Sequence, residues 1–371
     1  MRRDVVARQA EAMAAQGLDA ILSSSPENFA YVTGFLSPTQ QLMRWRHAMA
    51  LVTRDATVSL LVVDMEASTV RAKAPDAEIA VWREFKFEAM PMLADLLRKH
   101  GLAAGRIGVE YDYLPYGDII ALQKLVPQAR LEPVQALLAR LRQIKTPDEI
   151  NILRKLSYIA DRGIADAFAG VKAGMTEMDL AGVLSRRMYE LGADHFKIMI
   201  VATGERSVFP NVGPTNRVLK RGDICRVEIF PTLNGYMAGV CRTGYVEAPP
   251  ANAEWIWANL TACKNLLLAA IKPGADSRAI YDLYLSKVGE LHLPPISFIG
   301  HGIGLHLHED PYLGPTEGQP LEPQMVIAIE PLIYDTGYGF GMQNKDMVLV
   351  TDDGCELLSS YTNTDQLIRI S

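Results

Sequence analysis

The sequence lacks three features that would place it in a specialised class of protein. No apolar run approaches the roughly 20 residues that a membrane-spanning helix needs, so no membrane partner is expected. Acidic and basic residues are interspersed, with a formal net charge of −6 and no basic stripe that could neutralise phosphates. No nucleic-acid partner is therefore expected. Low-complexity segments are also absent.

Cysteine is scarce as well. The chain has four cysteines without a CxxC pair or other paired spacing, namely Cys225, Cys241, Cys263 and Cys355. This pattern indicates free thiols in a reducing compartment rather than disulfides. The first residues predict the start of an amphipathic helix and not a secretion signal. We therefore expect a cytoplasmic protein.

The composition that is present suits two packed domains. The chain has 371 residues, of which 49% are hydrophobic and 22% are charged. Helix and strand patterns alternate in the first third, which predicts a small α/β domain. The predicted helices are 4–17 and 88–100, and the predicted strands are 20–22, 48–52, 58–63 and 106–109.

A strong helix start marks the expected domain boundary. In Thr146-Pro147-Asp148-Glu149, threonine suits the N-cap, proline the first helical position and glutamate the reciprocal capping position. We therefore predict domains at 1–145 and 146–371. The second domain alternates long helices with strands, in two segments that each have a helix pair followed by strands.

One predicted strand, 224–229, carries a charged pair. Side chains alternate along a strand, so Arg226 and Glu228 share a face. A charged pair inside an apolar strand is costly unless it is paired or functional. A solvated sheet face is the alternative interpretation.

A hairpin is predicted directly after this strand. Asn234-Gly235 is typical of a two-residue turn between paired strands. The pairing would set Gly239 and Cys241 near Arg226 and Glu228.

Histidines gather in a glycine-rich segment, 300–311. Three of the chain's seven histidines lie there, at His301, His306 and His308. Imidazole is a common metal ligand and a common acid or base near neutral pH, so this grouping favours a site over isolated structural histidines. Glu330 ends an apolar strand just before a proline, where a side chain can point into a cleft. A solvated strand end is the alternative for Glu330.

Taken in order, these segments resemble the creatinase/methionine aminopeptidase/prolidase superfamily, which includes aminopeptidase P. The resembling segments span nearly the whole chain, from Glu27–Phe35 through Ile144–Ile150 to Lys345–Gly354. The resemblance implies an α/β (α+β) fold, with a smaller creatinase-like N-terminal domain before a pita-bread catalytic domain. It also implies a homodimer.

The resemblance also identifies the family's metal-binding positions. Metallopeptidases of the family hold two divalent ions with two aspartates, one histidine and two glutamates, and these positions fall on Glu228, Gly239, His301, Glu330 and Lys345. A two-ion site needs several carboxylates, and here glycine and an ammonium group replace two ligands. We therefore expect no metal and no other cofactor. Lys345, alone or together with Arg226, would supply the missing positive charge.

Creatinase is the family's metal-free hydrolase, and the chain resembles it more than the metallopeptidases. Its active-site histidine position falls on Asn211, and two of its glutamate positions fall on Cys241 and Asn344. Creatine itself is therefore not the expected substrate. The expected reaction is metal-independent hydrolysis of a C–N bond (amide, lactam or ureido) in a small molecule that carries a carboxylate.

Roles for this creatinase-like amidohydrolase follow from the resemblance. The expected catalytic residues are His301, His308, Glu330, Glu228 and Lys345. A histidine held by a glutamate would take a proton from water and return it to the leaving nitrogen. Lys345 and Arg226 would stabilise the oxyanion. Asn211 would bind the substrate carbonyl.

Cys241 is a further candidate, as a substrate-binding residue or second nucleophile, because a thiolate near cations is activated. The stronger alternative is a small buried apolar residue. In creatinase-like dimers, a loop of one subunit binds the substrate carboxylate in the partner's cleft. Arg44, Trp45 and Arg46 suit that loop, since arginine pairs with carboxylates and tryptophan stacks on flat or cationic groups. A plain surface or interface cluster is the alternative.

Two other functions stay open. One is a metal-dependent Xaa-Pro dipeptidase or aminopeptidase with a reduced ligand set, which would contain stoichiometric metal and lose activity with a chelator. The other is a non-catalytic binding protein of the same fold, in which mutation of His301, His308 or Glu330 would affect no turnover.

Overall fold

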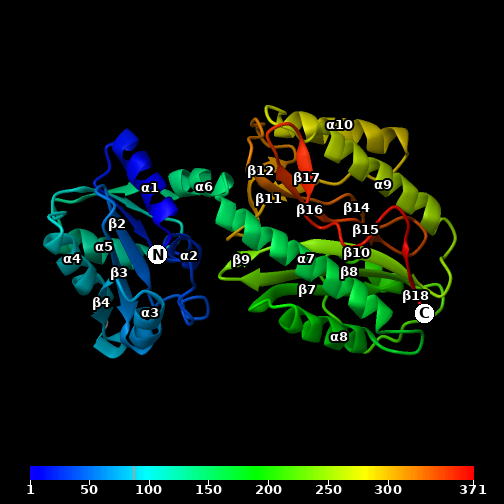
Figure 1. The fold of residues 1–371 in the computed structure, drawn as a ribbon, viewed down its shortest axis with the longest axis horizontal. Coiled ribbons are helices and arrows are strands. Elements are labelled where there is room, and N and C mark those ends of the chain that lie inside the picture. The colour runs from blue at the N-terminus through cyan, green and yellow to red at the C-terminus, as the bar shows by residue number, and fades with distance from the viewer. Residues whose placement is uncertain (87) are drawn as a thin grey trace. The chain divides into compact units, whose positions relative to one another are not determined.

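The computed structural model describes residues 1–86 and 88–371, and these form two compact units, Met1–Arg142 and Gln143–Ser371 (Figure 1). The expected domain boundary between residues 145 and 146 stays a prediction. Among the described residues, no helix combines the length and the apolar character needed to cross a membrane.

The first unit is built on a six-stranded mixed sheet in the order β4-β3-β2-β1-β5-β6. Its strands are β1 (Ala20–Ser23), β2 (Met49–Thr53), β3 (Val58–Val63), β4 (Glu78–Trp82), β5 (Arg106–Val109) and β6 (Arg130–Pro133). Its helices are α1 (Arg3–Gln16), α2 (Pro26–Thr33), α3 (Ala67–Lys73), α4 (Ala89–Lys99) and α5 (Tyr116–Leu125), with short 3-10 helices η1 (Asp64–Glu66) and η2 (Glu84–Lys86). Helix α6 (Gln135–Gln143) leads into the second unit.

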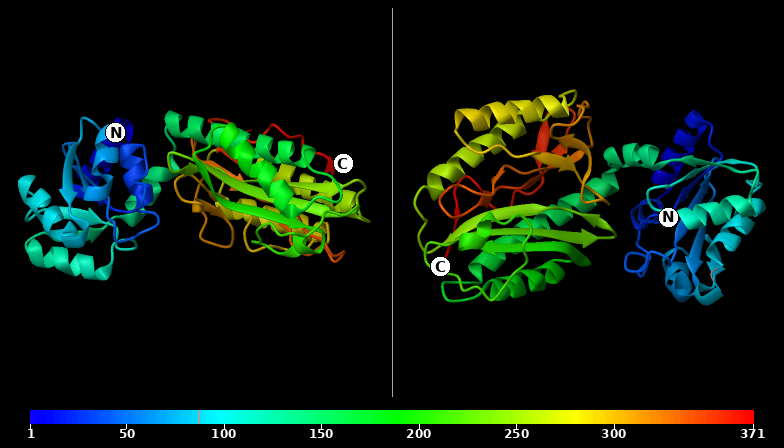
Figure 2. Two further views of the ribbon diagram at one scale, coloured as in Figure 1. Left: turned by 90° about the horizontal axis from the view of Figure 1, so that it is seen from below. Right: turned by 180° about the vertical axis from the view of Figure 1, so that it is seen from behind.

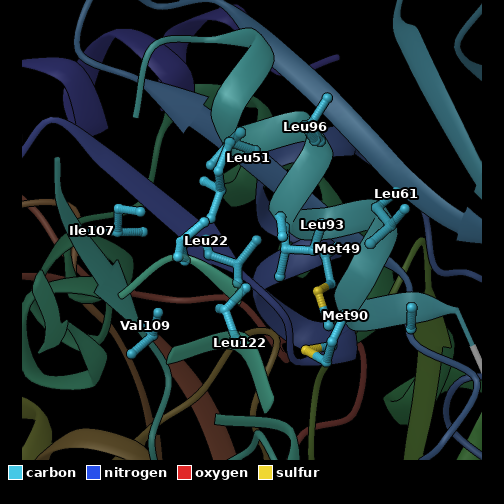
Figure 3. Close-up of a cluster of buried hydrophobic side chains, with 14 of the residues drawn as sticks. Leu22, Met49, Leu51, Leu61, Met90, Leu93, Leu96, Ile107, Val109 and Leu122 are labelled. Carbon is cyan, nitrogen blue, oxygen red and sulfur yellow. The ribbon is translucent and has the colours of Figure 1, made fainter. Parts of the chain in front are cut away.

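Alternation of side chains along the strands divides the core of this unit between the two faces of the sheet. Leu22 and Leu51 point to one face, where they pack with Leu93 of α4 and Leu122 of α5 (Figure 3). The neighbouring Ile21 belongs to a second cluster, with apolar residues of α1 and α2. The predicted α/β architecture of the first domain is therefore confirmed.

The second unit contains two larger sheets and a two-stranded one. The first sheet has the order β18-β10-β8-β7, with β9 paired to β8: β7 (His195–Thr203), β8 (Ile224–Leu233), β9 (Tyr236–Met237), β10 (Val240–Val246) and β18 (Ile368–Ile370). The second has the order β12-β11-β13-β16-β17: β11 (Gly300–Gly302), β12 (Glu309–Leu313), β13 (Val326–Ile329), β16 (Asp346–Val350) and β17 (Cys355–Leu357). The small sheet pairs β14 (Leu332–Ile333) with β15 (Met342–Gln343).

Two helix pairs cover these sheets on opposite sides of the second unit (Figure 2). The helices of the unit are α7 (Pro147–Ala169), α8 (Glu177–Glu190), α9 (Ala253–Ala270) and α10 (Ser277–Glu290), with the 3-10 helix η3 (Gly204–Val208). Helix α7 contacts β8 and β10, α8 contacts β7, and α10 contacts α9 and β12. The strands between the helix pairs carry the polar residues singled out by the sequence.

Local interactions explain where helix α7 begins and why the chain turns between β8 and β9. The capping box forms as predicted, because the Thr146 hydroxyl accepts from the Glu149 amide and the Glu149 carboxylate accepts from the Thr146 amide at 2.9 Å. Asn234 and Gly235 both have positive φ, 53° and 92°, which suits the tight turn between paired strands.

A buried charge network joins these elements behind the sheets. Arg242 of β10 is fully buried and donates to Asp161 of α7 and to Asp346 of β16, each at 2.8 Å. Lys264 of α9 lies 3.2 Å from the second oxygen of Asp346. Arg242 also donates at 2.9 Å to the backbone carbonyl of Lys345. Two positive and two negative side chains therefore balance in the interior and fix the backbone next to Lys345.

Replacing Arg242 with methionine is expected to destabilise the protein by about 3–5 kcal/mol, because removal of one partner leaves buried carboxylates uncompensated. Urea unfolding measures the change in the free energy of unfolding. The matched control is Arg221→Met, since Arg221 makes an exposed pair with Glu247 and such pairs contribute at most about 1 kcal/mol. Equal losses in the two variants would contradict the prediction.

Candidate active site

Strand pairing brings three ionisable side chains of the second unit together. Cys241 of β10 lies opposite Glu228 of β8 and also bridges to Lys345, which directly precedes β16. The ammonium nitrogen of Lys345 lies 3.0 Å from Glu228 Oε1 and 3.1 Å from Glu330 Oε2. The side chains of Lys345, Glu228 and Glu330 are all buried, and the Lys345 ammonium also lies 4.8 Å from the centre of the Phe230 ring.

The two carboxylates keep Lys345 charged. Burial by itself lowers the pKa of Lys345, but Glu228 and Glu330 together outweigh burial and raise that pKa above its ordinary value. Burial raises the pKa of Glu330; Lys345 opposes that rise and Glu228 adds to it. The three groups therefore form one mutually dependent cluster.

Two stacked imidazoles lie beside this cluster. The rings of His301 and His308 are 3.8 Å apart between centroids, with 18° between their planes. His301 Nδ1 lies 2.8 Å from the Gly302 carbonyl oxygen, which can only accept, so the hydrogen is assigned to Nδ1 and Nε2 is left as an acceptor. Burial lowers the pKa of His301 well below its usual value, and Lys345 and His308 lower it further. His301 is thus a neutral imidazole near pH 7.

His308 is the exposed ring of the pair. Partial burial and then Lys345 lower the pKa of His308, against the opposing effect of Glu228. Phe298 and Tyr312 pack edge-on against it, with centroid distances of 5.6 Å and 5.8 Å. The predicted catalytic residues therefore lie in one cluster of imidazole, carboxylate and ammonium groups with an aromatic wall.

Two acceptor atoms in this cluster have no hydrogen-bond partner among the residues that the structure describes. They are His301 Nε2 and Glu330 Oε1, both buried and 3.5 Å apart. Buried polar atoms in folded proteins are normally paired. A shared proton, or an O–H or N–H donor of a bound molecule, would satisfy both. These two atoms are therefore the part of the cluster that can still accept a hydrogen bond.

Arg226 lies in the same region but its guanidinium is engaged by the protein. Its Nε donates to the Ser207 carbonyl at 3.2 Å, Nη2 to the Phe209 and Pro210 carbonyls, and Nη1 at 3.0 Å to Gln343 Oε1. These contacts hold the segment that leads to Asn211. The geometry therefore favours a structural role for Arg226 over the expected oxyanion contact.

Gln343 is a site residue that sequence analysis missed. Its amide nitrogen donates at 3.3 Å to Glu330 Oε2, and its oxygen accepts from Arg226, so it links the carboxylate to the arginine. The available signal was its spacing, because Gln343 lies two positions before Lys345 on a strand-like segment and so shares its face.

The remaining expected binding residues of the second unit lie at different depths. Asn211 is exposed on the segment after η3. Cys241 is fully buried, and burial followed by the Glu228 charge raises the pKa of its thiol well above the ordinary value. A thiol of raised pKa is a poor nucleophile near pH 7. The geometry therefore favours the small buried residue over the nucleophile.

The arginines of the N-terminal cluster have partners within the first unit. Arg44 donates at 3.1 Å to the Tyr113 carbonyl and lies over the Tyr113 ring, while Arg46 pairs with Glu84 at 2.7 Å. Trp45 is 58% exposed. Contact of this cluster with a substrate stays a prediction.

The side chains of this cluster do not fit the pair of divalent ions that the resemblance implies for metallopeptidases. The Lys345 ammonium lies between the carboxylates. Gly239 has no side-chain atom that could bind a metal, and a Cβ added there would lie 2.3 Å from the Phe230 ring. Within residues 1–86 and 88–371 no three His, Cys, Asp or Glu side chains are grouped to hold an ion.

Replacing Lys345 with methionine is expected to cost about 3–5 kcal/mol of stability at pH 7.5, because two buried carboxylates lose their cation. Without Lys345 the folded-state pKa of Glu330 rises further above its unfolded value. The folded protein then holds a proton more tightly, so the deficit is smallest at low pH and grows as pH rises through the raised pKa.

Urea unfolding between pH 5 and pH 8 measures this dependence. The double variant K345M/E330Q is expected to recover part of the loss. The exposed Lys272 provides the control, since K272M is expected to leave the profile unchanged. A K345M deficit that is constant across this range would contradict the pairing.

Known proteins resemble this chain along its length. Residues 6–144 match the Creatinase/Prolidase N-terminal domain, and residues 151–352 match Metallopeptidase family M24. A peptidase of Bacillus subtilis (YqhT) is 28% identical over 341 residues, covering 91% of this chain and 92% of the relative. The Xaa-Pro dipeptidase of Pyrococcus furiosus is 26% identical over 308 residues, covering 81% of this chain and 86% of that enzyme. The Xaa-Pro dipeptidase structure from Bacillus anthracis superposes with a TM-score of 0.84 at 24% identity and covers 99% of each chain.

These findings confirm the expected superfamily and the two-part pita-bread fold. They contradict the main functional expectation, a metal-independent hydrolase of a carboxylate-bearing amide, lactam or ureide, because the matched family is a metallopeptidase family and one relative is an Xaa-Pro dipeptidase. The coarser expectation, a hydrolase acting on C–N bonds, agrees with the family. Because the family match covers more than half of the 371 residues, the chain belongs to metallopeptidase family M24.

Proposed function

We propose that the protein is a peptidase-type hydrolase that cleaves the C–N bond of a dipeptide-sized substrate of the Xaa-Pro class. The relative from Pyrococcus furiosus supports the substrate class. The observation that carries the proposal is the buried, unpartnered pair of acceptors, His301 Nε2 and Glu330 Oε1. A peptidase needs such a point to orient the attacking water and the leaving nitrogen.

The protonation state of His301 suits proton transfer. Its Nε2 faces the site as an acceptor while Nδ1 is held by the Gly302 carbonyl. An acceptor of this kind takes a proton from an attacking water and returns it to the leaving nitrogen. The charged Lys345 beside it favours negative charge on the carbonyl oxygen of the scissile bond. No step is assigned to the neutral thiol of Cys241.

The aromatic wall offers a surface for a compact ring. Its rings are Phe298 and Tyr312, which contact each other edge-on and both pack against His308. Apolar rings pack well against aromatic edges and faces. The proposal therefore places the prolyl ring of the substrate against this wall.

The proposal includes a small-molecule partner and a homodimer in a reducing compartment. Exposed apolar side chains of the first unit support a subunit contact, since Leu42 is 83%, Trp45 58% and Phe85 86% exposed. In such a dimer Arg44 and Arg46 would approach the substrate carboxylate. Free, unpaired cysteines among the described residues support a cytoplasmic setting.

One observation favours a second function, a non-catalytic binding protein. Lys345 occupies one oxygen of each buried carboxylate. A cluster that is already neutralised in this way can hold a peptide without cleaving it. Binding without turnover distinguishes this function from the first.

The test is hydrolysis of a panel of Xaa-Pro dipeptides by the full-length protein, in parallel arms with added Mn²⁺, Co²⁺ or Zn²⁺ and with a chelator. Turnover of at least one dipeptide is expected, and the arm in which it occurs reports the metal requirement. His301→Ala is expected to lower kcat by about 10²–10⁴-fold, the usual contribution of a general acid–base residue.

His292→Ala is the control, because His292 is exposed and lies outside the cluster. Absence of turnover in every arm would exclude the peptidase. Dipeptide binding by calorimetry in that case would favour the binding protein instead.

A further inference from the structure

A buried ion pair outside the catalytic cluster has no role in the proposed chemistry. The ammonium nitrogen of Lys145 lies 2.7 Å from Glu309 Oε2, with side-chain exposures of 2% and 4%. The two residues are 164 positions apart. Ion pairs this deeply buried seldom add net stability relative to apolar residues, and in some proteins their role is to define a geometry.

Glu309 closes the histidine segment. It begins β12 and lies opposite Gly302 of β11, so the loop 303–308 connects the two strands. The second carboxylate oxygen, Oε1, accepts from the His306 amide at 3.2 Å. The Glu309 carboxylate therefore binds the loop through one oxygen and Lys145 through the other.

Lys145 is itself fixed on the protein. Its amide donates at 3.0 Å to the Gln324 carbonyl, and the next residue, Thr146, is the N-cap of helix α7. A Cβ added at Gly304 would lie 3.1 Å from the Lys145 nitrogen and 3.2 Å from Glu309 Oε2. The pair is thus packed directly against the glycine-rich loop.

The hairpin strand β9 completes the support. The Tyr236 hydroxyl donates at 2.9 Å to Glu149 Oε1, and the Met237 amide donates at 2.8 Å to the Gly304 carbonyl. The start of α7, the hairpin and the loop therefore meet in one buried polar junction.

The two stacked imidazoles lie at the two ends of this loop. His301 directly precedes Gly302, and His308 directly precedes Glu309. The register of β11 and β12 shifts between His301 and Gly302, so regular strand pairing does not set how the rings meet. Glycine contributes no side chain that could fix the loop.

We propose that Lys145 and Glu309 are positioning residues, which hold His308 over His301 so that His301 Nε2 faces Glu330. The consequence for catalysis rests on the proposed function, whereas the positioning itself does not. Because the pair acts through backbone placement, its loss lowers kcat and leaves KM nearly unchanged.

The test uses K145M/E309Q in the full chain, which removes both charges while glutamine can still accept from the His306 amide. Diethylpyrocarbonate modifies accessible imidazoles, and peptide mass spectrometry gives the rate at each histidine. In the native protein His301 is fully buried under His308. Its modification rate is expected to rise about tenfold in the variant, because loss of the junction lowers the cost of local opening.

Exposed His195 and His292 serve as internal references and are expected to keep their rates. The control variant is R154M/E356Q, which removes a half-exposed ion pair of the same unit and is expected to leave His301 protected. Urea unfolding identifies any variant that is not folded. For that case Gly304→Ala probes the junction by pressing on the same ion pair, with the same increase expected.

Unchanged protection of His301 in folded K145M/E309Q, or in folded G304A, overturns the proposal. This readout needs no substrate, so it decides the positioning role even where no dipeptide is turned over. Where turnover exists, a fall in kcat with constant KM supports the role, and equal changes in all histidine rates contradict it.

Discussion

The contact on which the site depends is the ammonium of Lys345 between the carboxylates of Glu228 and Glu330. Two buried carboxylates so close to each other need a positive charge, and here the chain supplies it. The backbone that presents Lys345 is held by Arg242, whose own charge is balanced by Asp161 and Asp346. The position of the Lys345 cluster therefore depends on the buried charge network of Arg242.

This arrangement explains both the strength and the limit of an interpretation from sequence. The sequence alone indicates that Gly239 and Lys345 stand at two metal-ligand positions of the family. The structure does place Lys345 between the carboxylates of Glu228 and Glu330. The step from those positions to a metal-independent function was wrong, because the chain matches a metallopeptidase family and one relative is an Xaa-Pro dipeptidase. Side chains that do not fit two divalent ions characterise the local site. They do not by themselves determine which reaction the protein catalyses.

Local chemistry accounted for the features that sequence analysis predicted well. The capping box at Thr146, the turn at Asn234-Gly235 and the pairing of Cys241 with Glu228 each depend on neighbouring residues or on strand alternation. The link from Gln343 to Glu330 and the ion pair of Glu309 were missed, because they join residues that only the tertiary fold brings together. Strand alternation places Gln343 on the same face as Lys345, but it does not identify Glu330 or Lys145 as contact partners.

Helix α7 connects these distant contacts. Its 23 residues correspond to about 34 Å at the standard rise per residue. Lys145, directly before its N-cap, contacts the histidine loop, and Glu149 in its first turn contacts the hairpin, while Asp161 in its second half pairs with Arg242, which holds the backbone at Lys345. The imidazoles of His301 and His308 and the ammonium of Lys345 are therefore all positioned by contacts to the same helix. Insertion of one residue into its middle would turn one anchor by about 100° around the helix axis relative to the other, so the length of α7 is itself part of the active-site design.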